Sequence, residues 1–172
     1  VVVGDRVIVE PDGDSSAIVE ILPRSNYVIR RASNLSKESH IIAANIDRAL
    51  LIVTLHSPTT AREFVDRFLV TCEAYRVPVT IVIGKADMLT GEYEAEAEEF
   101  EAIYSDAGYD IIRLSSTTGE GVEQIRALLN NKKTLVAGNS GVGKSTLISN
   151  IDPTLVIRTG EISESHHKGK HT

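Results

Sequence analysis

Apolar and polar residues alternate in three short segments near the beginning of the chain, at residues 5–10, 17–22 and 26–31. The turn-forming residues 11–14 separate the first two segments, as they do in a β-hairpin. Three strands at this spacing indicate part of a small β-barrel, although three strands do not close one. We therefore predict a partial barrel over residues 1–38.

From about residue 41 the pattern changes to continuous apolar runs that alternate with amphipathic segments. The runs lie at residues 49–53, 79–83 and 111–114, and the amphipathic segments lie at residues 60–75, 93–107 and 122–129. A continuous apolar run is typical of a strand in a parallel sheet that is covered on both faces. The alternating order predicts an α/β fold with a doubly wound, mostly parallel sheet over residues 39–172.

A further apolar strand, predicted at residues 133–137, leads into a segment that fits the phosphate-binding pattern G-x-x-x-x-G-K-[ST] without mismatch. The segment consists of Gly138, Asn139, Ser140, Gly141, Val142, Gly143, Lys144, Ser145 and Thr146. Its glycines let successive backbone N–H groups face a phosphate, and the following helix adds the partial positive charge of its N-terminus. We expect Lys144 to contact the β- and γ-phosphates as a catalytic residue and the Ser145 hydroxyl to bind Mg²⁺. The pattern predicts a nucleoside-triphosphate site.

Two further loops follow apolar strands at the same predicted edge of the sheet. One contains Gly84, Lys85 and Asp87, and the other contains Ser115, Ser116 and Thr117. They resemble the N-K-x-D and S-A-K loops of guanine-nucleotide-binding proteins, in which the Asp accepts hydrogen bonds from guanine N1–H and the exocyclic amine and the second loop donates a backbone N–H to guanine O6. Gly84 stands where Asn is expected, so we expect base selection by Asp87 with reduced nucleotide affinity. This departure leaves a P-loop ATPase as an alternative.

The order of the loops is unusual, because the phosphate-binding loop follows the base-binding loops along the chain. Such a circular permutation is tolerated where the last helix of a domain ends beside its first strand, and the short connection from residues 122–129 to residues 133–137 fits such a join. With this order, residues 139–146, 160–163 and 169–172 resemble the circularly permuted bacterial GTPases that assist small ribosomal subunit maturation, the ribosome small subunit-dependent GTPase A family. The resemblance runs along nearly the whole chain.

The resemblance implies an N-terminal oligonucleotide-binding (OB) barrel that contacts RNA, a circularly permuted P-loop GTPase domain and a C-terminal zinc-binding domain. Residues 1–38 fit part of the OB-like barrel, and residues 39–172 fit the GTPase domain. The D-x-x-G segment and the zinc domain do not occur in the given sequence, so zinc is expected only in a further C-terminal domain. By matching position, the resemblance implies that His171 is catalytic and orients the attacking water, and that Thr172 binds Mg²⁺.

Composition narrows the classes of protein that remain. The net charge of −6 argues against nonspecific nucleic-acid binding by the whole surface. Four cations nevertheless lie close to Tyr27 in the sequence: Arg24, Arg30, Arg31 and Lys37. They form either a nucleic-acid face or a set of solvated residues at a strand edge. The single cysteine, Cys72, excludes a disulfide framework, and no apolar run reaches the length of a membrane span. We expect a cytoplasmic monomer without a membrane partner.

Together with the resemblance, these patterns predict an enzyme that hydrolyses GTP to GDP and phosphate, with Mg²⁺ bound to the nucleotide. Its expected partners are the small (30S) ribosomal subunit, whose late maturation it assists and which stimulates it, and the 16S rRNA of that subunit. One alternative, besides the ATPase, is a GTP-switched assembly factor that binds rRNA and turns over GTP only incidentally. Single-turnover hydrolysis with and without small subunits separates that factor from the enzyme.

Overall fold

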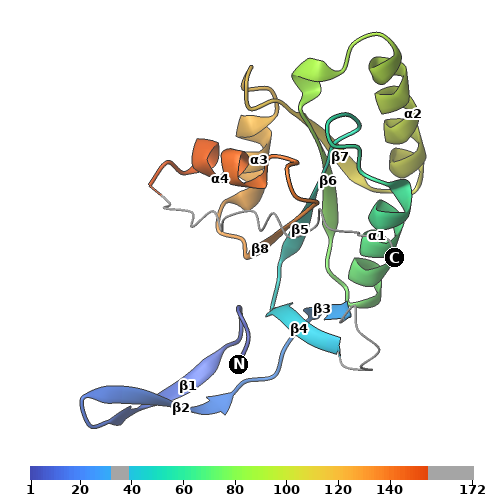
Figure 1. Cartoon of the computed structure of the whole chain (residues 1–172). Coiled ribbons are helices and arrows are strands. Elements are labelled where there is room, and N and C mark those ends of the chain that lie inside the picture. The colour runs from blue at the N-terminus through green and yellow to red at the C-terminus, as the bar shows by residue number, and fades with distance from the viewer. Residues whose placement is uncertain (32–38, 155–172) are drawn as a thin grey trace, which may run out of the picture.

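The computed structural model describes residues 1–31 and 39–154, and Figure 1 shows the order of its elements. Four strands come first: β1 (Val7–Asp12), β2 (Ser15–Ile21), β3 (Tyr27–Arg31) and β4 (Ser39–Ala44). Strands and helices then alternate: β5 (Arg48–Val53), α1 (Arg62–Ala74), β6 (Val79–Gly84), a short 3₁₀ helix (Ala86–Met88), α2 (Glu92–Asp106), β7 (Asp110–Leu114), α3 (Val122–Leu129), β8 (Thr134–Ala137) and α4 (Lys144–Ile151). Lys37, His171 and Thr172 lie outside the described residues.

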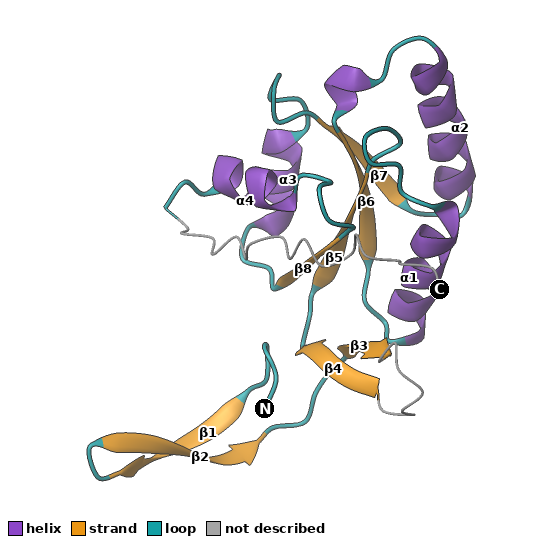
Figure 2. Cartoon of the chain, in the orientation of Figure 1, coloured by secondary structure: helices purple, strands orange, loops and turns teal. Residues whose placement is uncertain are grey.

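Strands β5 to β8 form a parallel sheet in the order β7-β6-β5-β8. Helices α1 and α2 lie on one face of this sheet and α3 and α4 on the other (Figure 2). Because side chains alternate along a strand, β5 contributes to two cores. Leu51 and Val53 pack in the core shared with α1 and α2, whereas Leu50 and Ile52 pack in the core shared with α3 and α4. This double covering is the reason for the continuous apolar runs, and the predicted doubly wound sheet is confirmed.

The helices bury the apolar stripes that the sequence indicates. Helix α1 buries Val65, Leu69 and Cys72, and burial raises the pKa of the Cys72 thiol to about 11, so this cysteine is an unreactive core residue. Helix α2 buries Phe100 and Tyr104 against the same face of the sheet. None of the helices in residues 1–31 and 39–154 combines the length and apolar character that crossing a bilayer requires.

The N-terminal strands form two antiparallel pairs, β1 with β2 and β3 with β4. The sequence analysis expected three strands here and missed β4, the partner of β3. Large apolar side chains are exposed on β1 and β2, including Val9 at 55% and Val19 at 51% of their surface. The proposed boundary between residues 1–38 and residues 39–172 falls between the paired strands β3 and β4, and the division into an RNA-binding OB-like part and a GTPase part stays a prediction.

Arg24, one of the cations near Tyr27, is bound to a carboxylate in the structure. Its Nε donates to Asp5 Oδ1 at 2.7 Å and its Nη2 to Asp5 Oδ2 at 2.9 Å. These bonds, together with the Val2 N–H that also donates to Asp5, hold the pKa of the Asp5 carboxyl well below its usual range. Tyr27 packs against Tyr75, with their ring centroids 4.7 Å apart. Arg24 therefore serves the fold of the N-terminal segment. The side chains of Arg30, Arg31 and Lys37 lie outside the described part of the chain.

Candidate nucleotide-binding site

The carboxyl ends of β5, β6, β7 and β8 meet at one edge of the parallel sheet (Figure 1). The predicted nucleotide-binding residues lie at the end of β6, in the loops that follow β6, β7 and β8, and in the first turn of α4. In open α/β sheets this edge is where ligands bind, because helix N-termini and loop N–H groups gather there. The order of the strands brings together loops that are separated along the chain.

The phosphate-binding loop lies between β8 and α4, held against the sheet by its first residue. Gly138 has a φ of 145°, and a β-carbon on it would lie 2.4 Å from the carbonyl oxygen of Ile52 in β5. Only glycine permits so close an approach of two backbones. Further along the loop, Val142 is buried in the core shared with α3 and α4. The sheet and this core fix the path of the loop.

Lys144 is the first residue of α4, and its side chain folds back over the loop. Its Nζ donates to the carbonyl oxygens of Gly138 at 2.8 Å and Asn139 at 2.6 Å. Burial lowers the pKa of this lysine from its ordinary value. A phosphate in the loop would present its oxygens to this ammonium and to the unpaired N–H groups at the start of α4. The predicted phosphate contact is therefore consistent with the position of Lys144.

Ser145 and Thr146 follow in the first turn of α4, and both are exposed. A serine hydroxyl is a hard oxygen ligand, and Mg²⁺ bound to nucleotide phosphates needs only one or two ligands from the protein. Ser145 thus fits a nucleotide-bound Mg²⁺. The second predicted ligand, Thr172, and the predicted catalytic His171 lie outside the described residues. Among the residues that are described, no group of three or more His, Cys, Asp or Glu side chains could hold a metal ion.

Asp87 and Ser115, from the two predicted base-binding loops, are in direct contact. The Ser115 hydroxyl donates to Asp87 Oδ1 at 2.6 Å, and its oxygen accepts the N–H groups of Thr117 at 3.2 Å and Thr118 at 3.1 Å. Ser115 is buried, whereas Asp87, Ser116 and Thr117 are exposed. The hydrogen bond from Ser115 is the main reason that the pKa of Asp87 lies below its ordinary value. Asp87 is thus an ionised acceptor at the surface, fixed by a buried hydroxyl.

Gly84 and Lys85 connect this base-binding region with the phosphate-binding loop. Gly84 ends β6, and a β-carbon on it would lie 3.2 Å from the carbonyl oxygen of Val142. Lys85 follows with a left-handed backbone, φ 59°, and its Nζ donates to the carbonyl oxygen of Ser57. The predicted phosphate and base contacts are therefore neighbours, and the turn after β5 adjoins both of them.

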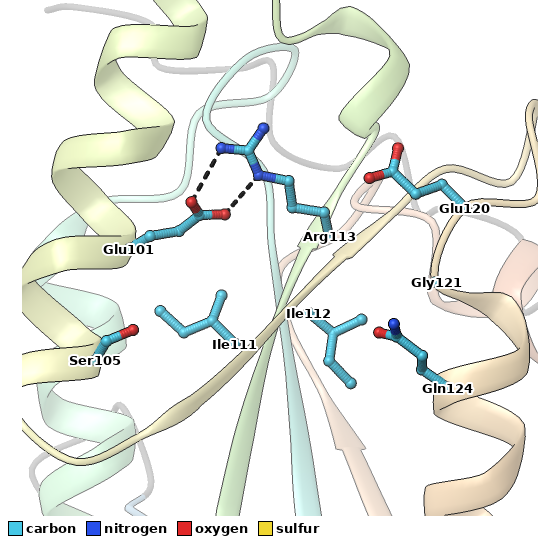
Figure 3. Close-up of a pocket in the computed structure, with 8 residues that line it drawn as sticks. All are labelled: Glu101, Ser105, Ile111, Ile112, Arg113, Glu120, Gly121 and Gln124. Carbon is cyan, nitrogen blue, oxygen red and sulfur yellow. Dashed lines mark hydrogen bonds and ion pairs between the residues drawn. The ribbon is translucent and has the colours of Figure 1, made fainter.

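Arg113, which the sequence analysis did not single out, ties the two base-binding loops to the rest of the fold. It lies on β7, and Figure 3 shows its guanidinium facing Glu101 on α2 beside a cavity of about 420 Å³. Its Nε and Nη2 donate to Glu101 at 2.6 and 3.0 Å, and its Nη1 donates to Glu94 at 2.6 Å. The strand that leads to Ser115 is thereby joined to the helix that follows Asp87. Only the glutamate-rich composition of residues 92–101 could have hinted at this network.

Comparison with known proteins gives a consistent result. A family model described as RsgA GTPase matches residues 21–172. Two curated relatives, both described as small ribosomal subunit biogenesis GTPase RsgA, come from Porphyromonas gingivalis (51% identical) and Bacteroides fragilis (47% identical). Each match covers 100% of this chain and 56% of the relative, so the chain spans about half the length of the curated relatives it matches.

Two solved structures share the fold. YjeQ from Thermotoga maritima matches with a TM-score of 0.76 and 36% identity, over 93% of this chain and 54% of that one. YloQ, described as a circularly permuted GTPase, matches with a TM-score of 0.66 and 32% identity, over 89% of this chain and 50% of that one. The predicted circularly permuted P-loop GTPase fold is confirmed by these matches and by the parallel sheet.

Proposed function

The chain belongs to the RsgA GTPase family, and on this premise we propose that it binds GTP, hydrolyses it to GDP and phosphate, and assists maturation of the small ribosomal subunit. The observation that carries the proposal is the Asp87 carboxylate, fixed by Ser115 at the same sheet edge as the phosphate-binding loop. A phosphate-binding loop serves ATP and GTP alike, whereas a carboxylate in the base site favours a base with two N–H donors.

In the proposed reaction, water attacks the γ-phosphorus and the bond to the β–γ bridging oxygen breaks. Lys144 and the backbone N–H groups of residues 138–146 stabilise the negative charge on the phosphate oxygens. Ser145 and Thr172 would hold a nucleotide-bound Mg²⁺, which would neutralise charge between the β- and γ-phosphates. His171 is proposed to orient the attacking water, as the family resemblance implies.

The base site of the proposal consists of Asp87 and the loop that begins at Ser115. Asp87 accepts hydrogen bonds from guanine N1–H and the exocyclic amine, and a backbone N–H of residues 115–117 donates to guanine O6. Adenine offers neither the N1–H nor the oxygen, so it would leave the carboxylate and the loop N–H without partners. The side chain of Lys85 is proposed to lie along the base.

The proposed partners are the small ribosomal subunit and its 16S rRNA, because the curated relatives are described as small ribosomal subunit biogenesis GTPases. We place the protein in the cytoplasm as a monomer, and we assign RNA contact to the OB-like part at residues 1–38. The zinc site that the resemblance implies is proposed for sequence beyond the given residues. These assignments concern the natural full-length protein.

A nucleotide competition assay on the full-length protein tests the proposal. A fluorescent GDP analogue should be displaced by GTP and GDP but not by ATP at matched concentrations, and turnover should rise when small subunits are added. If ATP displaces the analogue as effectively as GTP does, the result would favour the ATPase alternative, which remains because Gly84 stands where the guanine-binding pattern has Asn. Tight GTP binding without an increase in single-turnover rate on subunits would favour the GTP-switched assembly factor.

Replacing His171 by alanine is expected to abolish most of the subunit-stimulated rate, because the attacking water is no longer oriented. The contacts that bind the nucleotide and the small subunit remain. GTP affinity and cosedimentation with small subunits should stay close to those of the unmodified protein. The measurement is stimulated GTP turnover of the full-length variant, with His167→Ala as the matched control from the same segment. Stimulation equal to that of the unmodified protein would remove His171 from the mechanism.

Replacing Gly84 by asparagine is expected to tighten GDP and GTP binding several-fold, which corresponds to roughly the free energy of one neutral hydrogen bond. The new β-carbon would meet the Val142 carbonyl at 3.2 Å, so the loop must yield slightly, and the side-chain amide would then lie within reach of both that loop and the base. Dissociation constants from competition binding measure the change. Unchanged or weaker binding would mean that the loop cannot yield, and that Gly84 is required by packing.

A further inference from the structure

The turn that follows β5, residues 54–60, lies between the two nucleotide-binding loops; we call it the β5 turn. On one side, a β-carbon on Gly141 of the phosphate-binding loop would lie 3.7 Å from Pro58 Cδ. On the other side, the carbonyl oxygen of Ser57 accepts a hydrogen bond from Nζ of Lys85. The β5 turn therefore lies beside a residue assigned above to the phosphates and is hydrogen-bonded to a residue assigned to the base.

Two buried threonines fix the shape of the β5 turn. Thr54 and Thr60 are 0% and 4% exposed. The N–H of Thr54 donates to Thr60 Oγ1 at 3.1 Å, and the N–H of Thr60 donates to the Thr54 carbonyl at 2.7 Å. The Thr54 hydroxyl donates to the Pro58 carbonyl at 2.5 Å. The buried Thr54 hydroxyl therefore holds the carbonyl of the exposed Pro58 in place, and its removal would release this part of the turn.

Thr54 also borders the position where this chain departs from the guanine-binding pattern. A β-carbon on Gly84 would lie 3.5 Å from Thr54 Cγ2 and 3.2 Å from the Val142 carbonyl oxygen. A side-chain amide at position 84 could join the base-binding and phosphate-binding loops directly, and glycine provides none. The β5 turn lies between the same two loops, with Pro58 beside Gly141 and Ser57 hydrogen-bonded to Lys85.

We propose that the β5 turn, fixed by the Thr54 hydroxyl, takes over the bracing of the nucleotide-binding loops that a side chain at Gly84 would otherwise provide. Thr54 is then a positioning residue, which acts on the nucleotide through Pro58, Ser57 and Lys85. This inference rests on the proposed binding of guanine nucleotides. Pre-organised loops bind more tightly because less ordering is required on binding, so loss of the brace should appear as lost affinity.

The test is a cycle of two substitutions in the natural full-length protein. Thr54→Val keeps the methyl group beside Gly84 and replaces the hydroxyl by a second methyl group, which cannot donate to the Pro58 carbonyl, and it should weaken GDP and GTP binding roughly tenfold. In a Gly84→Asn background, where the side chain restores a direct brace, the same substitution should cost less than about threefold. Competition binding with a fluorescent GDP analogue gives all four dissociation constants.

Two variants control for local damage. Thr59→Val removes an exposed hydroxyl of the same turn that donates only to the Leu55 carbonyl, at 3.2 Å, and should leave affinity unchanged. Thr54→Ser keeps the hydroxyl and should bind nucleotide almost as the unmodified protein does. If Thr54→Val does not fold, Pro58→Ala, which removes the ring beside Gly141 and keeps the carbonyl, takes its place in the cycle.

The outcomes separate this inference from the proposed function. If Thr54→Val lowers affinity equally in both backgrounds, together with thermal stability, the threonine only supports the fold and the inference is overturned. Unchanged affinity in Thr54→Val overturns it as well. If instead the unmodified protein does not prefer GDP and GTP over ATP, the proposed function fails before the cycle is begun.

Discussion

Replacing Lys144 by alanine is expected to weaken the binding of both GDP and GTP at least tenfold. The ammonium is held over the phosphate-binding loop by the carbonyl groups of Gly138 and Asn139, 2.8 and 2.6 Å away. In the proposed site a cation in this position would meet the β-phosphate of either nucleotide, so the loss should not be confined to GTP. Turnover should fall further than affinity, because charge on the phosphate oxygens grows in the transition state.

The control for Lys144→Ala is Lys132→Ala, which removes the same side chain from an exposed position between α3 and β8. This turn precedes β8 and therefore lies at the opposite edge of the sheet from the loop that follows β8. Nucleotide binding by the control should match that of the unmodified protein. Binding of GDP and GTP by Lys144→Ala that also stays unchanged would mean that this loop is not the nucleotide site.

The sheet and the phosphate-binding loop could be predicted because their signals are local in the sequence. Residues 49–53 and 79–83 are continuously apolar, and the double covering of β5 by two cores requires that composition. The helix predicted at residues 122–129 agrees with α3 because its apolar stripe and the preceding Gly121 mark both its face and its start. Gly138 could be predicted from the motif pattern alone, although the close approach that requires it is to Ile52 of β5, which is remote in the sequence.

The partners of the site residues could be predicted only in part. That Asp87 and Ser115 share an edge follows from the order of strands, but the 2.6 Å hydrogen bond between them joins residues 28 positions apart. The role of Arg113 depends on Glu94 and Glu101 from another element, and no sequence pattern specifies that pairing. The β5 turn was missed because its Ser, Pro and Thr residues resemble any polar connection between a strand and a helix.

The N-terminal strands were the least predictable part of the fold. Strand β4 ends at Ala44, and the sequence at Ser39–Ala44 gives no alternation that marks its register with β3. In β1 and β2 the apolar residues are exposed on both faces, so the sequence pattern does not indicate which face of the hairpin packs against the rest of the protein. The pairing of β3 with β4 therefore depends on contacts with the rest of the chain, such as those of Val28 and Ala43 in the core with Cys72.

Replacing Asp87 by asparagine is expected to weaken GTP binding about a hundredfold and to make xanthosine triphosphate the preferred ligand. In the proposed site the carboxylate would accept two N–H donors of guanine, whereas the asparagine amide presents one acceptor and one donor. Its donor would face the exocyclic amine of guanine, but in xanthine an oxygen replaces that amine and would accept the hydrogen bond. The Ser115 hydroxyl can still donate to the amide oxygen, so the loop should keep its shape.

Competition of GTP, xanthosine triphosphate and ATP against a fluorescent nucleotide measures this switch. Asp106→Asn, an exposed aspartate at the end of α2, is the matched control and should retain the preference for GTP. ATP should gain nothing from Asp87→Asn, since adenine lacks both the N1–H and the oxygen that the amide requires. If the Asp87→Asn variant still prefers GTP, guanine recognition by this carboxylate would be contradicted. The base would then bind at a different site, in keeping with the replacement of Asn by Gly84 in the guanine-binding pattern.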